Sequence, residues 1–138
     1  MRKVLLFLVG LGLASSLSAQ AVVKVHNTTS CNLVVQLTEV DPMCVNTAVV
    51  NYYVPAGGTI LVNASPGHEY IHAEIYPWPL CSGSISMSLG TAGLPCATCS
   101  WGIPSSNSFS TSGCSGCPPV IHGMWICDGS SGLIGLWG

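Results

Sequence analysis

Short segments in which apolar and polar residues alternate recur along this chain, and no long segment carries apolar residues at helical spacing. Alternation with a period of two is typical of half-buried β-strands, because successive side chains of a strand point to opposite faces. The clearest case is SISMSL, in which Ile85, Met87 and Leu89 alternate with serines. The chain is therefore expected to be all-β.

Clusters of Gly, Pro, Asn and Ser separate eight such segments and mark the turns between them. Short strands at this spacing predict a small β-sandwich, and a small β-barrel is the alternative. The expected strands are residues 21–26, 33–40, 47–54, 59–63, 69–76, 84–89, 120–127 and 133–137.

A strand that ends in HNTTSC is followed by a second strand and then by VPAGGTILV. This order resembles immunoglobulin-like modules of exported bacterial proteins, in which a Pro-Ala-Gly turn leads into a core strand. The resemblance covers residues 22–63. It implies an immunoglobulin-like sandwich and no catalytic residue.

The first 21 residues have the composition of a secretory signal peptide. Arg2 and Lys3 precede an apolar run at residues 4–13, and small residues follow, ending in Ala19-Gln20-Ala21. The apolar run is too short to span a bilayer comfortably, and cleavage is expected after Ala19 or Ala21. The mature protein is then a single secreted or cell-surface domain of residues 22–138, with no membrane span.

Without the signal peptide, Lys24 is the one basic residue left, against five acidic residues. Binding to nucleic acid requires clustered Lys and Arg side chains that neutralise phosphates, so this class of function is excluded. The low charge also leaves little repulsion between copies of the chain, so we expect that the chain can self-associate.

The cysteines are even in number and all follow the signal peptide, which predicts a disulfide framework in an oxidising compartment. If residues 33–40 form one straight strand, Cys31 and Cys44 lie about 25 Å of chain apart and cannot pair with each other. Cys81 and Cys127, each near a strand end, are their expected partners. The eight are Cys31, Cys44, Cys81, Cys96, Cys99, Cys114, Cys117 and Cys127.

Residues 90–119 form a long insertion rich in Ser, Gly, Pro and Cys. A loop of this length is expected either to be functional or to be held by cross-links. Trp101 and Phe109 would be the apolar anchors of a binding loop, or would fold back onto the sandwich. The two C-x-x-C pairs in the insertion resemble a four-thiolate zinc site in spacing, although export favours disulfides.

The stretch HEYIH, His68 to His72, matches the zinc motif H-E-x-x-H of metalloproteases. That motif works on a helix, where residues four apart share one face. Here the surrounding residues predict a strand, on which the two histidines would stand about 13 Å apart and could not share one metal ion. On that strand Tyr70 would join His68 and His72 in a polar row, with Glu69 on the opposite face.

These features together predict a non-enzymatic structural, adhesive or binding module without a cofactor. Its partner would be a protein, a cell surface or a second copy of itself. The alternatives are a secreted zinc protein or minimal metallopeptidase that uses HEYIH or the paired C-x-x-C loop, and a small disulfide-rich effector or inhibitor.

Overall fold

The computed structural model describes residues 21–81, 83–89, 105–128 and 131–138. The predicted signal peptide, up to residue 20, lies outside the described residues, as do Cys96, Cys99 and Trp101. The part of the chain that the structure describes holds no helix long and apolar enough to cross a membrane.

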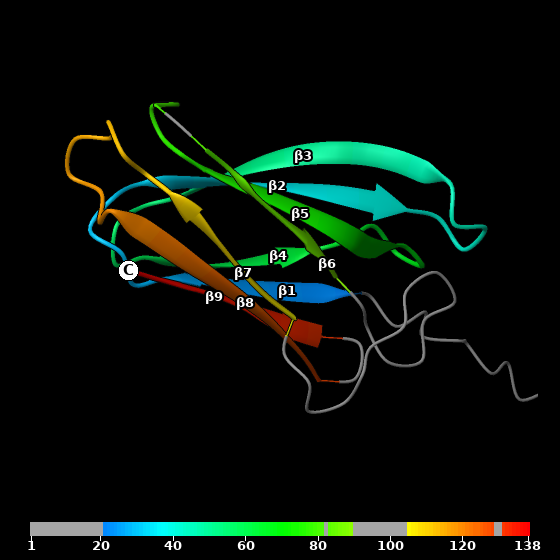
Figure 1. The fold of residues 1–138 in the computed structure, drawn as a ribbon. Helices are drawn as coiled ribbons and strands as arrows, with labels where there is room; N and C mark the ends of the chain where they lie inside the picture. Colours follow the sequence, from blue (N-terminus) through cyan, green and yellow to red (C-terminus); the bar gives the residue numbers. More distant parts are fainter. Residues whose placement is uncertain (1–20, 82, 90–104, 129–130) are drawn as a thin grey trace, which may run out of the picture.

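Two sheets pack face to face as a sandwich, and they do not close into a barrel (Figure 1). The five-stranded sheet, here sheet A, has the order β4-β1-β9-β8-β7, and the four-stranded sheet B has the order β3-β2-β5-β6. The strands are β1 (Val22–Asn27), β2 (Leu33–Val40), β3 (Asn46–Val54), β4 (Thr59–Asn63), β5 (Glu69–Pro77), β6 (Ile85–Ser88), β7 (Ser105–Ser110), β8 (Val120–Asp128) and β9 (Ser131–Trp137).

The prediction of an all-β sandwich is confirmed, and the alternating segments form the core as expected. In β1, Val23 and Val25 point inward between exposed residues, and in β6 Ile85 and Met87 do the same. The inner faces of both sheets contribute to one apolar cluster. Pairing is antiparallel throughout except between β1 and β9, which run parallel.

The expectation of one long loop at residues 90–119 is wrong in part, because Ser105–Ser110 forms β7 and pairs with β8. The sequence of β7 is SSNSFS, in which Phe109 is the single apolar residue. One apolar residue gives no alternation to recognise, and pairing with β8 supplies the order that the local sequence does not indicate. Phe109 is buried in the core.

A buried asparagine fixes the turns at one end of the sandwich. The Asn27 side chain is fully buried, and its amide nitrogen donates to the carbonyl oxygens of Cys31 at 2.9 Å and Pro55 at 3.0 Å. Its Oδ1 accepts from the backbone N–H and the hydroxyl of Thr29. These bonds join the β1–β2 connection to the β3–β4 turn, and they satisfy backbone groups that burial would otherwise leave unpaired.

The disulfide framework is present, with a different connectivity from the one expected. Cys31 pairs with Cys117, across a sequence separation of 86, and Cys81 pairs with Cys114. Their Cα atoms lie 4.8 Å and 5.3 Å apart. Cys31 and Cys44 indeed do not pair with each other, but Cys81 is not the partner of either. Since the segment after β7 returns to the ends of β2 and β5, proximity in space decides the pairing.

Cys44 and Cys127 are also disulfide-bonded, and no described cysteine is a free thiol. Together with the two pairs above, the cross-links involve every cysteine in the described ranges.

Gly132 in β9 lies against the ring of Trp125 in β8, and a Cβ atom there would stand 1.9 Å from the ring. We expect Gly132→Ala to lower the free energy of unfolding by about 1–3 kcal/mol, because the buried indole must shift. Gly135→Ala in the same strand is the control, since nothing lies within 4 Å of a Cβ at that position. Urea unfolding of both variants checks this, and equal stabilities would contradict it.

Candidate functional site

Residues 69–72 of the HEYIH stretch lie on a strand, as predicted. β5 begins at Glu69, and His68 precedes it in the turn after Ser65. The helix that an H-E-x-x-H zinc site requires is therefore not formed by these residues. Among the described residues, no three His, Cys, Asp or Glu side chains are grouped to hold a metal ion.

The predicted division of β5 into two faces is wrong at Tyr70. A β-bulge interrupts its pairing with β2, since Thr38 faces His72 while Glu39 faces Tyr70. Ile71 is the extra residue, and it reverses the alternation N-terminal to it. Tyr70 therefore lies in the core, whereas His72 stays on the outer face of the sheet.

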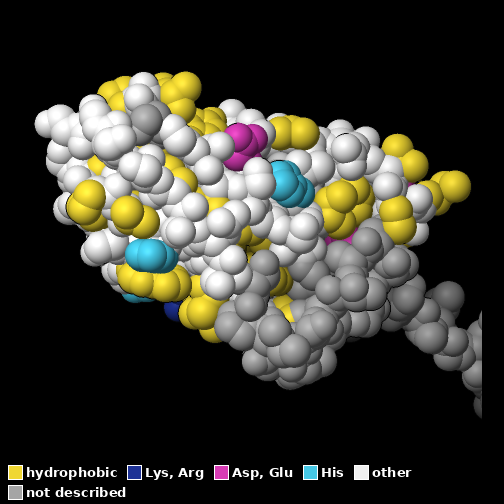
Figure 2. Space-filling model, in the orientation of Figure 1, with side chains coloured by type: hydrophobic (Ala, Val, Ile, Leu, Met, Phe, Trp, Pro, Cys, Tyr) yellow, Lys and Arg dark blue, Asp and Glu magenta, His cyan; other side chains and the backbone are white. Residues whose placement is uncertain are grey.

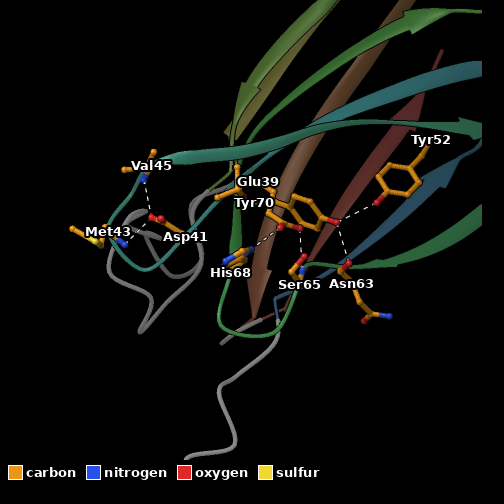
Figure 3. A network of polar contacts seen from close by, with 10 residues as sticks. Glu39, Asp41, Met43, Val45, Tyr52, Asn63, Ser65, His68 and Tyr70 are labelled. Carbon is orange, nitrogen blue, oxygen red and sulfur yellow. Dashed lines mark hydrogen bonds and ion pairs between the residues drawn. The ribbon is translucent and has the colours of Figure 1, made fainter.

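His68 is bound to a carboxylate that sequence analysis did not single out. Its Nδ1 lies 2.7 Å from Oε1 of Glu39, a buried residue of β2 (Figure 3). The other carboxylate oxygen of Glu39 accepts the backbone N–H of Ser65 at 3.0 Å. The alternation in β2 could have indicated this site, because Glu39 occupies the same face as Leu33 and Leu37.

These contacts set the ionisation of Glu39. Burial alone would raise the pKa of its carboxyl group, but the hydrogen bonds from His68 and Ser65 together lower the pKa below its ordinary value. The carboxylate form is thus favoured by the folded structure.

Tyr70 connects the two sheets beside this pair. Its hydroxyl donates to the carbonyl oxygen of Asn63 in β4 at 3.1 Å and lies 3.2 Å from the hydroxyl of Tyr52 in β3 (Figure 3). Burial, together with the hydrogen bond to Tyr52, raises the pKa of Tyr70. Because the hydroxyl keeps its proton, it remains a hydrogen-bond donor between sheets B and A.

The network of Glu39, Ser65, His68, Tyr70 and Tyr52 supports the fold at this end of the sandwich. No buried side-chain nitrogen or oxygen of the described residues lacks a hydrogen-bond partner. Both carboxylate oxygens of Glu39 are engaged by protein donors, so this arrangement stabilises the sandwich by itself and requires no ligand.

Two cysteines of the C-x-x-C pairs, Cys114 and Cys117, and one of the two loop aromatics, Phe109, lie among the described residues. Cys114 and Cys117 are each joined to a cysteine outside their own C-x-x-C pair, so their sulfurs are not thiolates that could bind zinc. Phe109 is buried, which corresponds to the alternative that it folds back onto the sandwich and does not face a partner.

The surface of the described residues contains one open sheet edge of unusual composition. β3 is nine residues long, pairs with β2 on one side, and has the uncharged sequence NTAVVNYYV. Val49 and Tyr53 in it are 58% and 51% exposed. At the opposite side, β6 and β7 approach each other, and the Asn107 amide of β7 donates to the Ser86 carbonyl of β6 at 3.2 Å. The β3 edge has no such neighbour among the described residues.

The turn that precedes β3 is held by hydrogen bonds to the side chain of Asp41. Oδ1 of Asp41 accepts the backbone N–H groups of Met43 and Val45, at 2.9 Å and 3.0 Å (Figure 3). This turn exposes the side chains of Met43 and Val45 at the start of the β3 edge. The exposed apolar surface therefore extends beyond the strand itself.

The outer face of sheet B carries aromatic side chains from separate strands. Val34 of β2 faces Tyr53 of β3 on one side and Tyr76 of β5 on the other. Directly opposed residues of neighbouring strands point to the same face, so the three form one row. Strand pairing brings them together, and the sequence alone does not show it.

Charged side chains are sparse on the molecule. Figure 2 shows one face, on which acidic and basic side chains are few and apolar side chains lie in separate groups. The chain has three Lys and Arg residues and five Asp and Glu residues in 138. Contacts made by this surface therefore depend mainly on apolar and hydrogen-bonding groups.

Neither protein-family models, nor curated proteins, nor solved structures match this chain. Its function is therefore inferred from its own residues and their geometry.

Glu39 should make the protein sensitive to acid. A carboxyl group whose pKa is lowered on folding contributes stability above its unfolded pKa of 4.5, and this is lost as pH falls through the folded value. We expect Glu39→Gln to be less stable than the wild type by about 1–2 kcal/mol at pH 7, and the difference to shrink below pH 4.5.

Urea unfolding of the wild type and of Glu39→Gln, at about six pH values between pH 3 and pH 7, measures the difference between their free energies of unfolding. Glu74→Gln is the control, because it removes a partly exposed carboxylate from the outer face of the same sheet. A difference between wild type and Glu39→Gln that stays constant with pH would contradict the role of the Glu39 carboxylate.

Proposed function

We propose that this protein is a secreted, non-enzymatic structural or adhesive module that associates with copies of itself along the β3 edge. The observation that carries the proposal is the open, uncharged, nine-residue edge strand. The low charge of the chain and its cross-linked sandwich are consistent with it.

An open edge strand exposes a row of backbone N–H and C=O groups that can pair with another strand. Soluble monomers usually protect such an edge with lysines, prolines, bulges or a short strand. β3 contains no charged residue and no proline over its nine residues. β3 pairs without interruption with residues Leu33 to Glu39 of β2. The one register shift lies between Glu39 and Val40 of β2, opposite the N-terminal end of β3.

Two β3 strands from neighbouring molecules would continue sheet B across the interface, with main-chain hydrogen bonds as the common attraction. Val49 and Tyr53 would lie beside their counterparts and lose exposed apolar surface. Neither strand would bring a charge to the contact, so electrostatic repulsion would not oppose it.

The proposed secretion is supported by the cysteines, because disulfides form and persist in oxidising compartments. If a signal peptide is removed, cleavage after Ala19 fits the fold better than cleavage after Ala21. Ala21 is fully buried, and its carbonyl oxygen accepts the backbone N–H of Ala64. Cleavage after Ala19 keeps this residue in the mature domain.

An immunoglobulin-like relationship is part of the proposal and concerns architecture alone. The support is the path of β1 to β4: the chain crosses from sheet A to sheet B after β1, and it returns through the Pro55-Ala56-Gly57-Gly58 turn into β4. Gly57 has a φ of 68°, a conformation that favours glycine at this turn.

The edge contact predicts concentration-dependent assembly. We expect the wild type to sediment as a dimer as its concentration rises, because the contact uses the β3 edge of both molecules. Val49→Lys combined with Tyr53→Lys should raise the dissociation constant about tenfold or more, because like charges would face each other across the contact. Analytical ultracentrifugation of the oxidised wild type and of the double variant measures their oligomeric states and dissociation constants.

Ser88→Lys is the matched control for this experiment, because Ser88 is an exposed residue of β6 at the opposite edge of the same sheet. It should assemble like the wild type. A wild type that stays monomeric at every concentration, or a Ser88→Lys variant that is impaired as strongly as the β3 variant, would refute the proposed contact.

A further inference from the structure

A hollow lies where β5 ends, on the outer side of sheet B. It has a volume of about 560 Å³, within the range of small-molecule sites. We propose that this hollow binds a small organic cation of the quaternary ammonium class. Its lining residues are Glu74, Tyr76, Trp78, Leu80, Gly83 and Ser84.

Glu74, Tyr76 and Trp78 of the lining come from the C-terminal part of β5 and the residue that follows it. Glu74 and Tyr76 are two residues apart in β5, so both point to the outer face, while Ala73 and Ile75 are buried. Trp78 follows directly after the strand. Its backbone N–H donates to the carbonyl oxygen of Asn32 at 2.9 Å, which fixes the residue at the strand end.

Two large apolar side chains in the lining of this hollow are exposed to solvent. The Trp78 side chain is 54% exposed, and Leu80 beside it is 69% exposed. A large aromatic side chain in this position loses water contacts when a ligand covers it, and the indole face carries the negative part of its quadrupole. Trp78 therefore offers both apolar contact and an attraction for positive charge.

Charge complementarity decides the class of ligand. Glu74 is the one charged side chain that lines the described part of the hollow, and its opposed neighbours Gln36 and Ser86 are neutral. The one lysine of the described residues, Lys24, lies on β1 in the other sheet. An anion would meet a carboxylate and no cation here, whereas a cation would be attracted by it.

A quaternary ammonium group fits these features better than a metal ion or an ordinary ammonium ion. Aromatic faces, with Trp the strongest, bind such groups through cation–π attraction. The group has no N–H donors, so it does not require the several acceptors that an ordinary ammonium ion needs. A single carboxylate is also too few ligands for a metal ion, which takes three or more protein donors in dedicated sites.

This site is independent of the proposed self-association. It lies at the end of β5, separated from β3 by β2 in the sheet order. No lining residue of the hollow belongs to β3, so each proposal can fail without the other.

The test compares choline with 3,3-dimethyl-1-butanol, which has the same shape without the charge. Titrations followed by ¹H–¹⁵N NMR report on the indole N–H of Trp78 and on the backbone of β5. We expect choline to bind with a dissociation constant of about 1 mM, and the neutral isostere at least about fivefold more weakly.

Three variants locate the site. Glu74→Gln combined with Leu61→Asp removes the carboxylate while an exposed position of β4, in the other sheet, restores the net charge, and choline affinity should fall about fivefold. Trp78→Ala should lower it about tenfold. Trp137→Ala is the matched control, because Trp137 is also exposed but stacks on His122 in sheet A.

The outcomes are decisive in both directions. Selective choline binding that depends on Glu74 and Trp78 supports the site. Equal binding of choline and the neutral isostere, or a neutral disaccharide that binds where choline does not, would overturn the assignment of a cation. Choline binding unchanged in Trp78→Ala, or absent at every concentration in the folded wild type, would overturn the site itself.

Discussion

The bulge in β5 places the Tyr70 side chain in the core, where it links the two sheets. With Ile71 as the extra residue opposite Thr38 and Glu39, Tyr70 turns inward, whereas Glu74 and Tyr76 keep the outward orientation of regular alternation. The hydroxyl of Tyr70 then bonds to β4 of the other sheet. One additional residue thus produces the polar link between the sheets.

The chain has few charged residues, and this affects both the composition of its surface and the environment of its carboxylates. A soluble surface with few ions relies on hydroxyl and amide groups, and it leaves apolar side chains such as Val49, Tyr53 and Trp78 exposed among them. Glu39 is held by protein donors and supports the fold, whereas Glu74 lies at a hollow that holds no basic side chain in its described lining.

Alternation predicted the all-β class and most strands because the inner faces are apolar, as in Ile85 and Met87 of β6. It failed at β7, where serines dominate and pairing with β8 determines the structure. It also failed at Tyr70, because a bulge depends on the register of two strands. The pairing of Glu39 with His68 could not be predicted from sequence, since the two residues lie 29 positions apart, whereas the lining residues of the hollow all lie within residues 74–84.

The parallel pairing of β1 and β9 has a mechanical consequence. Val22 is opposite Ser131 and Asn27 is opposite Leu136, so a chain pulled at the start of β1 and the end of β9 loads these two strands in shear. In shear, the hydrogen bonds between them bear force together, whereas peeling breaks them one at a time. The Cys31–Cys117 bond would then limit how far the chain between these residues extends once the sheets separate. The sandwich therefore resists forces that pull the start of β1 and the end of β9 apart.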